Sequence, residues 1–382
     1  LNTLFIIYFL RRNPIMKSQT AILKLSFSLF LQFITFSSAF GEDMSFKIGA
    51  TLPLSGELST YGKLILSGIE LAKNDLMDQG IKLDLIVEDT PLNGSGIIPI
   101  IDKMITINKI DAVAGNFSNQ AMFLMGNYLE KNKIAAFHTA AVDSHLEEFP
   151  KYILSTNTLI QDEAENLASY LYNKGYREIG VITILNHFGI SYRDFFESKF
   201  KSLGGKIVES TNFQMQDNDY RSQILKLKSK NPEVIFAACF GGYLGRILKQ
   251  SKQLGISTPF YSVYESEDSS VLESSEGFSN GLRYFVAYSK NNKYYLKFRD
   301  KFFTRFKKEP DTFATNAYDA TMLLGSAFKK CNDDKDCLIN ELYSTKNYNG
   351  ASGTISINQN GIAKKDFILK EIQNDQFVEV QE

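Results

Sequence analysis

Apolar and polar positions follow two different periods along the chain after residue 45. Residues 46–52 form an apolar run, and residues 81–89 are apolar at every second position, as in a partly buried strand. Between these segments, apolar side chains recur every three or four residues, at Ile65, Ile69, Ala72 and Leu76. This spacing places them on one face of a helix. The pattern therefore predicts a strand, a helix and a second strand in succession.

The same alternation occurs in two runs, over residues 46–139 and residues 162–264. Strands that alternate with helices of this length are typical of parallel sheets. Because there are too many units for one sheet, the predicted fold class is α/β with two doubly wound parallel-sheet domains. The C-terminal part contains two long helical segments and a β segment, at 294–310, 312–330 and 349–372. We expect it to return to the first two domains.

The N-terminal region has the pattern of a signal peptide. Met16 and Lys17 are followed by an apolar segment, and Ala39 and Gly41 occupy the small-residue positions of a cleavage site. We expect residues 1–41 to be removed by cleavage before Glu42. Residues 1–15 lie upstream of Met16 and are candidates for untranslated sequence. The alternative is a membrane anchor, but polar residues interrupt the apolar segment, which is short for a spanning helix.

The three cysteines suggest an oxidising compartment. Cys331 and Cys337 flank a polar segment, which a disulfide would close. Two free thiols are the alternative. Cys239 lies in an apolar run and is expected to be a buried small hydrophobic residue. No cysteine lies near the predicted cleavage site, so we expect no lipoprotein anchor.

Composition and motifs argue against several function classes. The formal net charge is −1, so the chain lacks the basic footprint of a nucleic-acid-binding protein. There are three histidines, and neither a zinc motif nor a nucleophile elbow occurs. Residues 56–64 come close to a phosphate-binding loop but differ in spacing and lack its Ser/Thr. Residues 240–248 only faintly suggest a dinucleotide turn, and a tight strand-to-helix turn is the better interpretation. We therefore expect no enzymatic activity and no cofactor or metal.

Polar and aromatic residues follow the predicted strands at the end where open parallel sheets bind ligands. The first domain offers hydroxyls, an amide and a helix N-terminus, from Ser55, Ser59, Tyr61, Asn116, Phe117, Ser118, Asn119, His138 and Thr139. The second domain offers aromatic rings and a carboxylate, from Asn186, His187, Phe188, Phe240, Tyr264 and Glu265. If these two sets of side chains face each other, they suit a small polar or zwitterionic molecule. The alternative is that these are ordinary capping and turn residues.

Taken together, the chain resembles the type I periplasmic substrate-binding proteins of ABC transporters, in the branched-chain amino-acid-binding (Leu/Ile/Val) family. The resemblance covers most of residues 46–373. It depends on four segments, which read KIGATLPLSGELSTYGKLILSGIELAKNDL, NHFGISYRDFFESKFKSLGGKIVES, DNDYRSQILKLKSKNPEVIF and YNGASGTISINQNG. The long polar turn after the first strand resembles the family's first ligand-facing loop.

The resemblance implies two lobes that close on a ligand about three hinge crossings. The expected N-terminal lobe comprises residues 44–159 and 287–351, and the expected C-terminal lobe comprises residues 160–286 and 352–382. The crossings are expected near residues 158–161, 285–288 and 351–354.

The resemblance also implies a ligand-binding set, which is Tyr61, Ser118, Asn119, Ala140, Ala141, Val142, Phe188, Phe240, Tyr264 and Glu265. The first-lobe members would hold a ligand carboxylate, and an acid of the second lobe would help to hold an α-ammonium group. Val142 stands where the family has a threonine, and Phe188 and Phe240 stand where it has tyrosines. The family's acid falls on Tyr264 or Glu265. We therefore expect a more apolar pocket than is usual in the family.

The implied function is an extracytoplasmic receptor that traps an amino acid or similar small carboxylate and delivers it to a membrane ABC permease. The alternative is a periplasmic sensory subunit that signals ligand state to a membrane histidine kinase or chemoreceptor. An enzyme on the same fold ranks last. We expect a periplasmic monomer that binds a small molecule and no nucleic acid.

Overall fold

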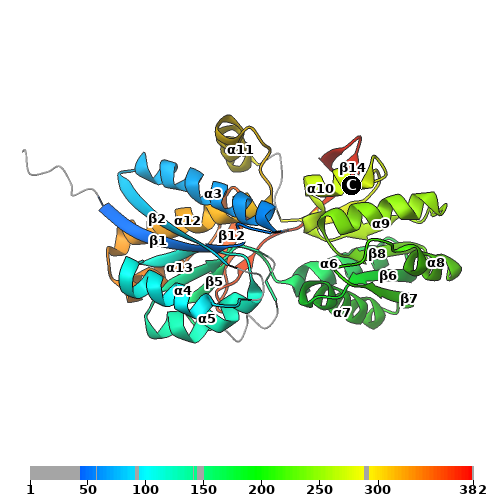
Figure 1. The fold of residues 1–382 in the computed structure, drawn as a ribbon, viewed down its shortest axis with the longest axis horizontal. Coiled ribbons are helices and arrows are strands. Elements are labelled where there is room, and N and C mark those ends of the chain that lie inside the picture. Colours follow the sequence, from blue (N-terminus) through cyan, green and yellow to red (C-terminus); the bar gives the residue numbers. More distant parts are fainter. Residues whose placement is uncertain are drawn as a thin grey trace, which may run out of the picture. The chain divides into compact units, whose positions relative to one another are not determined.

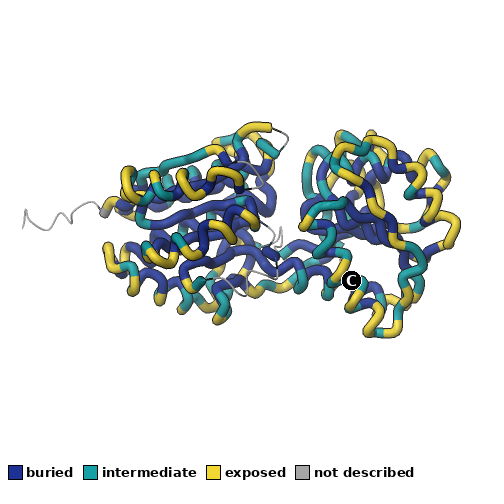
Figure 2. The backbone as a smooth tube through the Cα atoms, turned by 60° about the horizontal axis from the view of Figure 1, so that its bottom comes forward, coloured by how far each residue is buried: buried dark blue, intermediate teal, exposed yellow. Residues whose placement is uncertain are grey.

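The computed structural model describes residues 44–56, 58–90, 94–140, 142–143, 150–287 and 292–380. The predicted signal region, residues 1–41, lies outside the described residues. Within the described part, the apolar runs form buried strands and the amphipathic segments form helices that turn exposed residues outward (Figure 2). No helix in these ranges combines the length and the apolar character required to cross a membrane.

A five-stranded sheet forms the centre of what we call the first lobe (Figure 1). Its strands, in spatial order, are β2 (Ile81–Asp89), β1 (Met44–Leu52), β3 (Ala112–Asn116), β4 (Ala135–His138) and β5 (Ile153–Ser155). The pairs β1–β3, β3–β4 and β4–β5 are parallel. The helical segments between these strands are α3 (Ser59–Met77), α4 (Ile97–Lys103), η2 (Met104–Asn108) and α5 (Asn119–Lys131). The predicted strand–helix–strand succession is therefore present.

A seven-stranded sheet forms the centre of the second lobe. Its spatial order is β15 (Gln376–Glu379), β14 (Ile368–Gln373), β10 (Arg283–Val286), β9 (Phe260–Ser262), β8 (Val234–Ala238), β6 (Glu178–Ile184) and β7 (Lys206–Phe213). The strands from β7 to β10 pair in parallel, whereas β14 and β15 are antiparallel. The helical segments are α6 (Ile160–Asn173), α7 (His187–Ser202), α8 (Arg221–Ser229), α9 (Gly241–Gln253), η4 (Tyr264–Ser266) and α10 (Ser269–Ser275). The predicted α/β class with two parallel-dominated sheets is confirmed.

The C-terminal part packs onto both sheets. Helices α11 (Lys293–Phe306) and α12 (Thr312–Cys331) contact α3, and α13 (Lys335–Tyr343) contacts β4. Helix α12 approaches α3 very closely, because a Cβ on Gly68 would lie 2.2 Å from the carbonyl oxygen of Ala314. A glycine is therefore required there for the two helices to meet.

A three-stranded sheet of β11 (Tyr348–Gly350), β12 (Gly353–Ile357) and β13 (Ala363–Lys364) comes next. It lies with the first lobe, since the Ser155 N–H donates to the Gly361 carbonyl over 2.8 Å and Ile362 packs into that lobe's apolar core. This differs from the expected third crossing at 351–354, because burial of the apolar residues beyond that point retains them in the first lobe. We propose instead that this crossing lies at residues 365–367, before β14.

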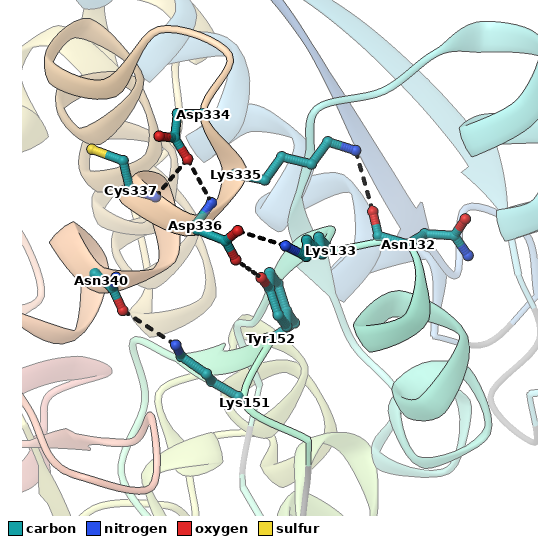
Figure 3. Close-up of polar contacts among 9 residues, drawn as sticks. All are labelled: Asn132, Lys133, Lys151, Tyr152, Asp334, Lys335, Asp336, Cys337 and Asn340. Carbon is teal, nitrogen blue, oxygen red and sulfur yellow. Dashed lines mark hydrogen bonds and ion pairs between the residues drawn. The ribbon is translucent and has the colours of Figure 1, made fainter.

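A disulfide links helix α13 to the end of α12, and a polar cluster joins α13 to residues that precede β4 and β5 (Figure 3). Cys331 and Cys337 form a disulfide with Cα atoms 5.5 Å apart. The Asp336 carboxylate accepts from Lys133 Nζ over 2.5 Å and from the Tyr152 hydroxyl over 2.9 Å. Because this ion pair is exposed, it contributes no more than about 1 kcal/mol.

Candidate functional site

An aromatic cluster lies where the strands of both sheets end. Tyr61 of α3 stacks on Phe117 at 5.6 Å between ring centroids and lies 5.0 Å from Phe313 of α12. The Phe240 ring, which belongs to the second lobe, lies edge-on to Tyr61 at 6.4 Å. Phe240 in turn contacts Phe188 at 5.3 Å. Rings from the two lobes thus form one apolar surface.

A close backbone approach places Phe240 and Tyr61 together. Gly241 follows Phe240 with φ of 52°, a conformation that favours glycine. A Cβ at this position would lie 3.0 Å from the Tyr61 hydroxyl. The segment that we interpreted as a tight strand-to-helix turn therefore brings helix α9 of the second lobe up to Tyr61.

Tyr61 also makes a polar contact with the second lobe. Its hydroxyl donates to Asp268 Oδ2 over 2.7 Å, although its side chain belongs to the first lobe. The other oxygen of Asp268 accepts from the Ser270 N–H and caps α10. Burial, and then the neighbouring Asp268 charge, raise the pKa of Tyr61, so this hydroxyl stays protonated and donates.

Two buried carboxyls lie next to the aromatic cluster. Glu163 is 3% exposed and accepts from the Tyr192 hydroxyl over 2.6 Å and from the Tyr264 N–H over 2.9 Å. Glu265 is 6% exposed, and its Oε2 atom has no hydrogen-bond partner among the described residues. Burial raises the pKa of Glu163 to about 8. Burial, and then the charge of Glu163, raise the pKa of Glu265 as well.

Further acids lie around the same place. Asp311 caps α12 by accepting from the Ala314 N–H over 2.9 Å, and burial raises its pKa to about 7. Glu267 is paired with Lys370 of β14 at 3.0 and 2.8 Å. This arrangement favours a positively charged or hydrogen-donating group, because an orphaned carboxylate oxygen accepts hydrogen bonds and aromatic faces attract cations.

On the first-lobe side, the predicted carboxylate-binding residues serve local structure. Ser118 caps α5 by accepting from the Ala121 N–H over 3.1 Å. Asn119 accepts from the Asp143 N–H through Oδ1 over 3.2 Å. The alternative interpretation, that these residues are helix caps, therefore applies to Ser118. As the cap, Ser118 lies at the N-terminus of α5.

The two described residues of the predicted segment 140–142 are both buried. Ala140 is buried, Ala141 lies outside the described residues, and Val142 is fully buried in the first-lobe core. The Val142 carbonyl accepts from the Ile160 N–H over 2.8 Å. The Val142 side chain therefore packs in the core, and its carbonyl lies beside the start of α6, the helix that carries Glu163.

A second polar contact joins the lobes through Asp143 and His187. His187 Nδ1 lies 2.5 Å from Asp143 Oδ2, and the Ser191 hydroxyl donates to the same oxygen over 3.3 Å. His187 starts α7 of the second lobe, whereas Asp143 follows the first-lobe strand β4. The described ranges contain no group of three or more His, Cys, Asp or Glu side chains able to hold a metal ion.

The structure brings together six of the residues singled out from the sequence, namely Tyr61, Phe117, Phe188, Phe240, Tyr264 and Glu265. Sequence reasoning missed the contributions of Glu163, Tyr192, Asp268, Asp311 and Phe313. Glu163 carried a signal, because it is an acid on the apolar face of a helix whose neighbours Ala164 and Leu167 are buried. The structural role of Asp268 depends on a contact between segments 207 residues apart, so it had no local signal.

Comparison with known proteins gives the context for this site. A family model described as periplasmic binding protein matches residues 45–376. The Leu/Ile/Val/Thr-binding protein of Salmonella typhimurium is 24% identical over 231 residues, which are 58% of this chain and 62% of that protein. The match therefore spans less than two thirds of the relative's length.

Solved structures share the fold. A leucine-binding protein LivK from Thermotoga maritima has a TM-score of 0.80 at 24% identity, with 88% of this chain and 98% of that chain covered. A solute-binding protein of an ABC transporter from R. palustris, in complex with benzoate, has a TM-score of 0.79 at 18% identity, with 88% and 95% covered. At these identities the likeness concerns the fold. Because the family model covers most of the chain, the chain belongs to the periplasmic binding protein family, in the type I group that includes the Leu/Ile/Val-binding proteins.

Proposed function

We propose that the protein is an extracytoplasmic receptor that traps an amino acid or similar small carboxylate between its two lobes. The observation that carries this proposal is the buried Oε2 atom of Glu265, an acceptor without a partner in the described part of the chain. It lies beside aromatic residues of both lobes. An ammonium group would satisfy this atom, and the rings would enclose an apolar side chain.

The first lobe supplies the complementary end of the site. The N-terminus of α5, where Ser118 is the cap, favours a negative group because its free N–H groups and the helix dipole point toward it. Amino acids are also the ligands in the names of several relatives, which supports this class. Delivery to a membrane ABC permease is the transport role that follows from the family. We propose no enzymatic activity and a monomeric state.

The proposed mechanism is closure of the lobes about the crossing segments. Tyr61 contacts Asp268 in this structure, and Asp143 contacts His187. Because each contact joins the two lobes, we expect both contacts to stabilise the closed form. The predicted signal region and the Cys331–Cys337 disulfide support a location outside the cytoplasm.

The test is thermal unfolding of the ligand-stripped protein in the presence of three probes. The probes share the branched hydrocarbon chain of leucine and differ in their charged groups. These are L-leucine, 3-methylbutylamine, which lacks the carboxylate, and 4-methylpentanoate, which lacks the ammonium. A ligand at about 100 times its Kd adds about 2.7 kcal/mol. We expect leucine to stabilise most. A shift with 4-methylpentanoate or benzoate alone would exclude the ammonium-bearing class while leaving a solute receptor.

Two variants assign the effect to Glu265. Glu265→Gln removes the charge while retaining the size, and we expect it to weaken leucine far more than 4-methylpentanoate. Glu273→Gln is the control, because Glu273 is an exposed residue of the nearby helix α10. Equal weakening of both probes by Glu265→Gln would contradict the assigned role.

A further inference from the structure

We propose that Glu163 is a second acidic residue of the ammonium site and that the Glu163–Glu265 pair exchanges a proton for the ligand's ammonium group. This inference rests on the proposed function and names how the same site is regulated. Its consequence is that ligand affinity depends on pH. A site with a single, well-solvated carboxylate would not show this dependence near neutral pH.

The geometry places both carboxyls in one buried unit. The Tyr264 N–H donates to Glu163 Oε1, and Glu265 is the next residue along the chain. The Tyr264 hydroxyl accepts from Asn157 Nδ2 over 3.1 Å and also interacts with the Glu265 carboxyl. Glu163 is thus satisfied by two donors, whereas Glu265 retains an orphaned oxygen. The carboxyl that faces a ligand is therefore Glu265, and Glu163 acts through it as a positioning residue.

No base in the described ranges neutralises the pair. The titratable groups that interact with either carboxyl are the hydroxyls of Tyr192 on α7, Tyr264 on η4 and Tyr61 on α3. All three remain protonated near neutral pH, since burial raises the pKa of each. Two buried carboxyls without a cation cannot both ionise cheaply, so at least one proton stays on the pair in the empty site.

An ammonium group changes this balance. It supplies the missing positive charge, which favours the ionised pair and releases a proton to solvent. Because ligand and proton compete, lowering the pH weakens binding. Where one proton is released per ligand, the dissociation constant rises roughly tenfold per pH unit. A probe that has no ammonium group gains nothing from the ionised pair and shows no such dependence.

The first measurement compares the protein before and after L-leucine is added. Infrared difference spectroscopy of the stripped protein at about pH 7 should show the carbonyl band of a protonated carboxylic acid. L-leucine should reduce this band, because the Glu163–Glu265 pair loses a proton, and part of the ligand-free band should be missing in Glu163→Gln. The control is Glu165→Gln, a neighbour on α6 whose side chain accepts from Gln161. A leucine-insensitive band would overturn the proposal.

The second measurement is calorimetric titration of wild type with L-leucine and 3-methylbutylamine between about pH 6 and about pH 8, in buffers of different ionisation enthalpy. We expect wild type to release close to one proton per ligand. The dissociation constant should be independent of pH in Glu163→Gln and should depend on pH as in wild type in Glu165→Gln. Leucine binding without proton release would overturn this inference and leave the proposed function standing. Failure of both ammonium probes to bind would overturn both.

Discussion

Replacement of Lys370 by methionine should destabilise the protein by far more than replacement of an exposed lysine. Lys370 lies in β14, and its side chain is 0% exposed, while the side chain of its partner Glu267 is 6% exposed. The ammonium group donates to both carboxylate oxygens, at 3.0 and 2.8 Å. Lys370→Met therefore leaves a buried carboxylate without this cation.

The magnitude follows from that burial. Removal of one partner of a buried ion pair costs about 3–5 kcal/mol, whereas replacement of both partners by neutral groups of similar volume is often nearly neutral. We expect the double variant Lys370→Met with Glu267→Gln to recover most of the loss. Lys364 is the matched control, because it pairs with Asp162 at 2.7 Å but both side chains are partly exposed. Lys364→Met should cost less than about 1 kcal/mol.

The assay is urea unfolding followed by far-ultraviolet circular dichroism, with the midpoint and slope fitted for each variant. Two results would refute the reasoning. One is a loss for Lys370→Met as small as that for Lys364→Met, and the other is a double variant no more stable than Lys370→Met.

Three further predictions concern the interface between the lobes, the disulfide and the acids. Tyr61→Phe removes the hydrogen bond to Asp268, and a bond to a charged group contributes about 1.5–3 kcal/mol, so calorimetry should show weaker leucine binding. Replacement of both Cys331 and Cys337 by serine opens a short loop and should lower the free energy of unfolding by roughly 2 kcal/mol in denaturant titrations. Glu163 has a pKa raised to about 8 by burial, so the ligand-free protein should lose stability as the pH rises from the ordinary glutamate range through about 8. Thermal unfolding should show that Glu163→Gln flattens this loss, and a wild-type protein more stable at high pH would contradict it.

The fold was largely predictable from the chain because its signals are local. The helix face of Ile65, Ile69, Ala72 and Leu76 is buried in α3, as the spacing predicted. Alternation of strands and helices then limits the sheet type, since parallel strands require crossover helices. The third crossing was harder to place, because apolar side chains beyond residue 351 could pack against either sheet. Two tertiary contacts support the later position, the Ser155–Gly361 hydrogen bond and the packing of Ile362 in the first-lobe core.

The candidate site was less predictable, because several of its contacts join distant segments. Phe240 and Glu265 could be found from their place after a strand. Phe313 could not, since it begins a helix of the C-terminal part and reaches Tyr61 only through the packing of α12 on α3. Glu163 stands out in the sequence as an acid on the apolar face of α6. Its neighbour Glu265 could not be inferred from spacing, because it lies in a distant segment.

The distribution of charge between the lobes bears on what the ligand must offer. On the first-lobe side, Ser118 and Asn119 already accept backbone hydrogen bonds, and Val142 is buried in the core. A ligand carboxylate would therefore depend mainly on the N–H groups of the α5 terminus. On the second-lobe side, Glu265 has an oxygen with no partner among the described residues and a second acid, Glu163, beside it. Because an unsatisfied buried charge costs more than a missing hydroxyl contact, we expect the ammonium group to dominate affinity. Removal of the ammonium from leucine should then weaken binding more than removal of the carboxylate, and the opposite order would place recognition in the first lobe.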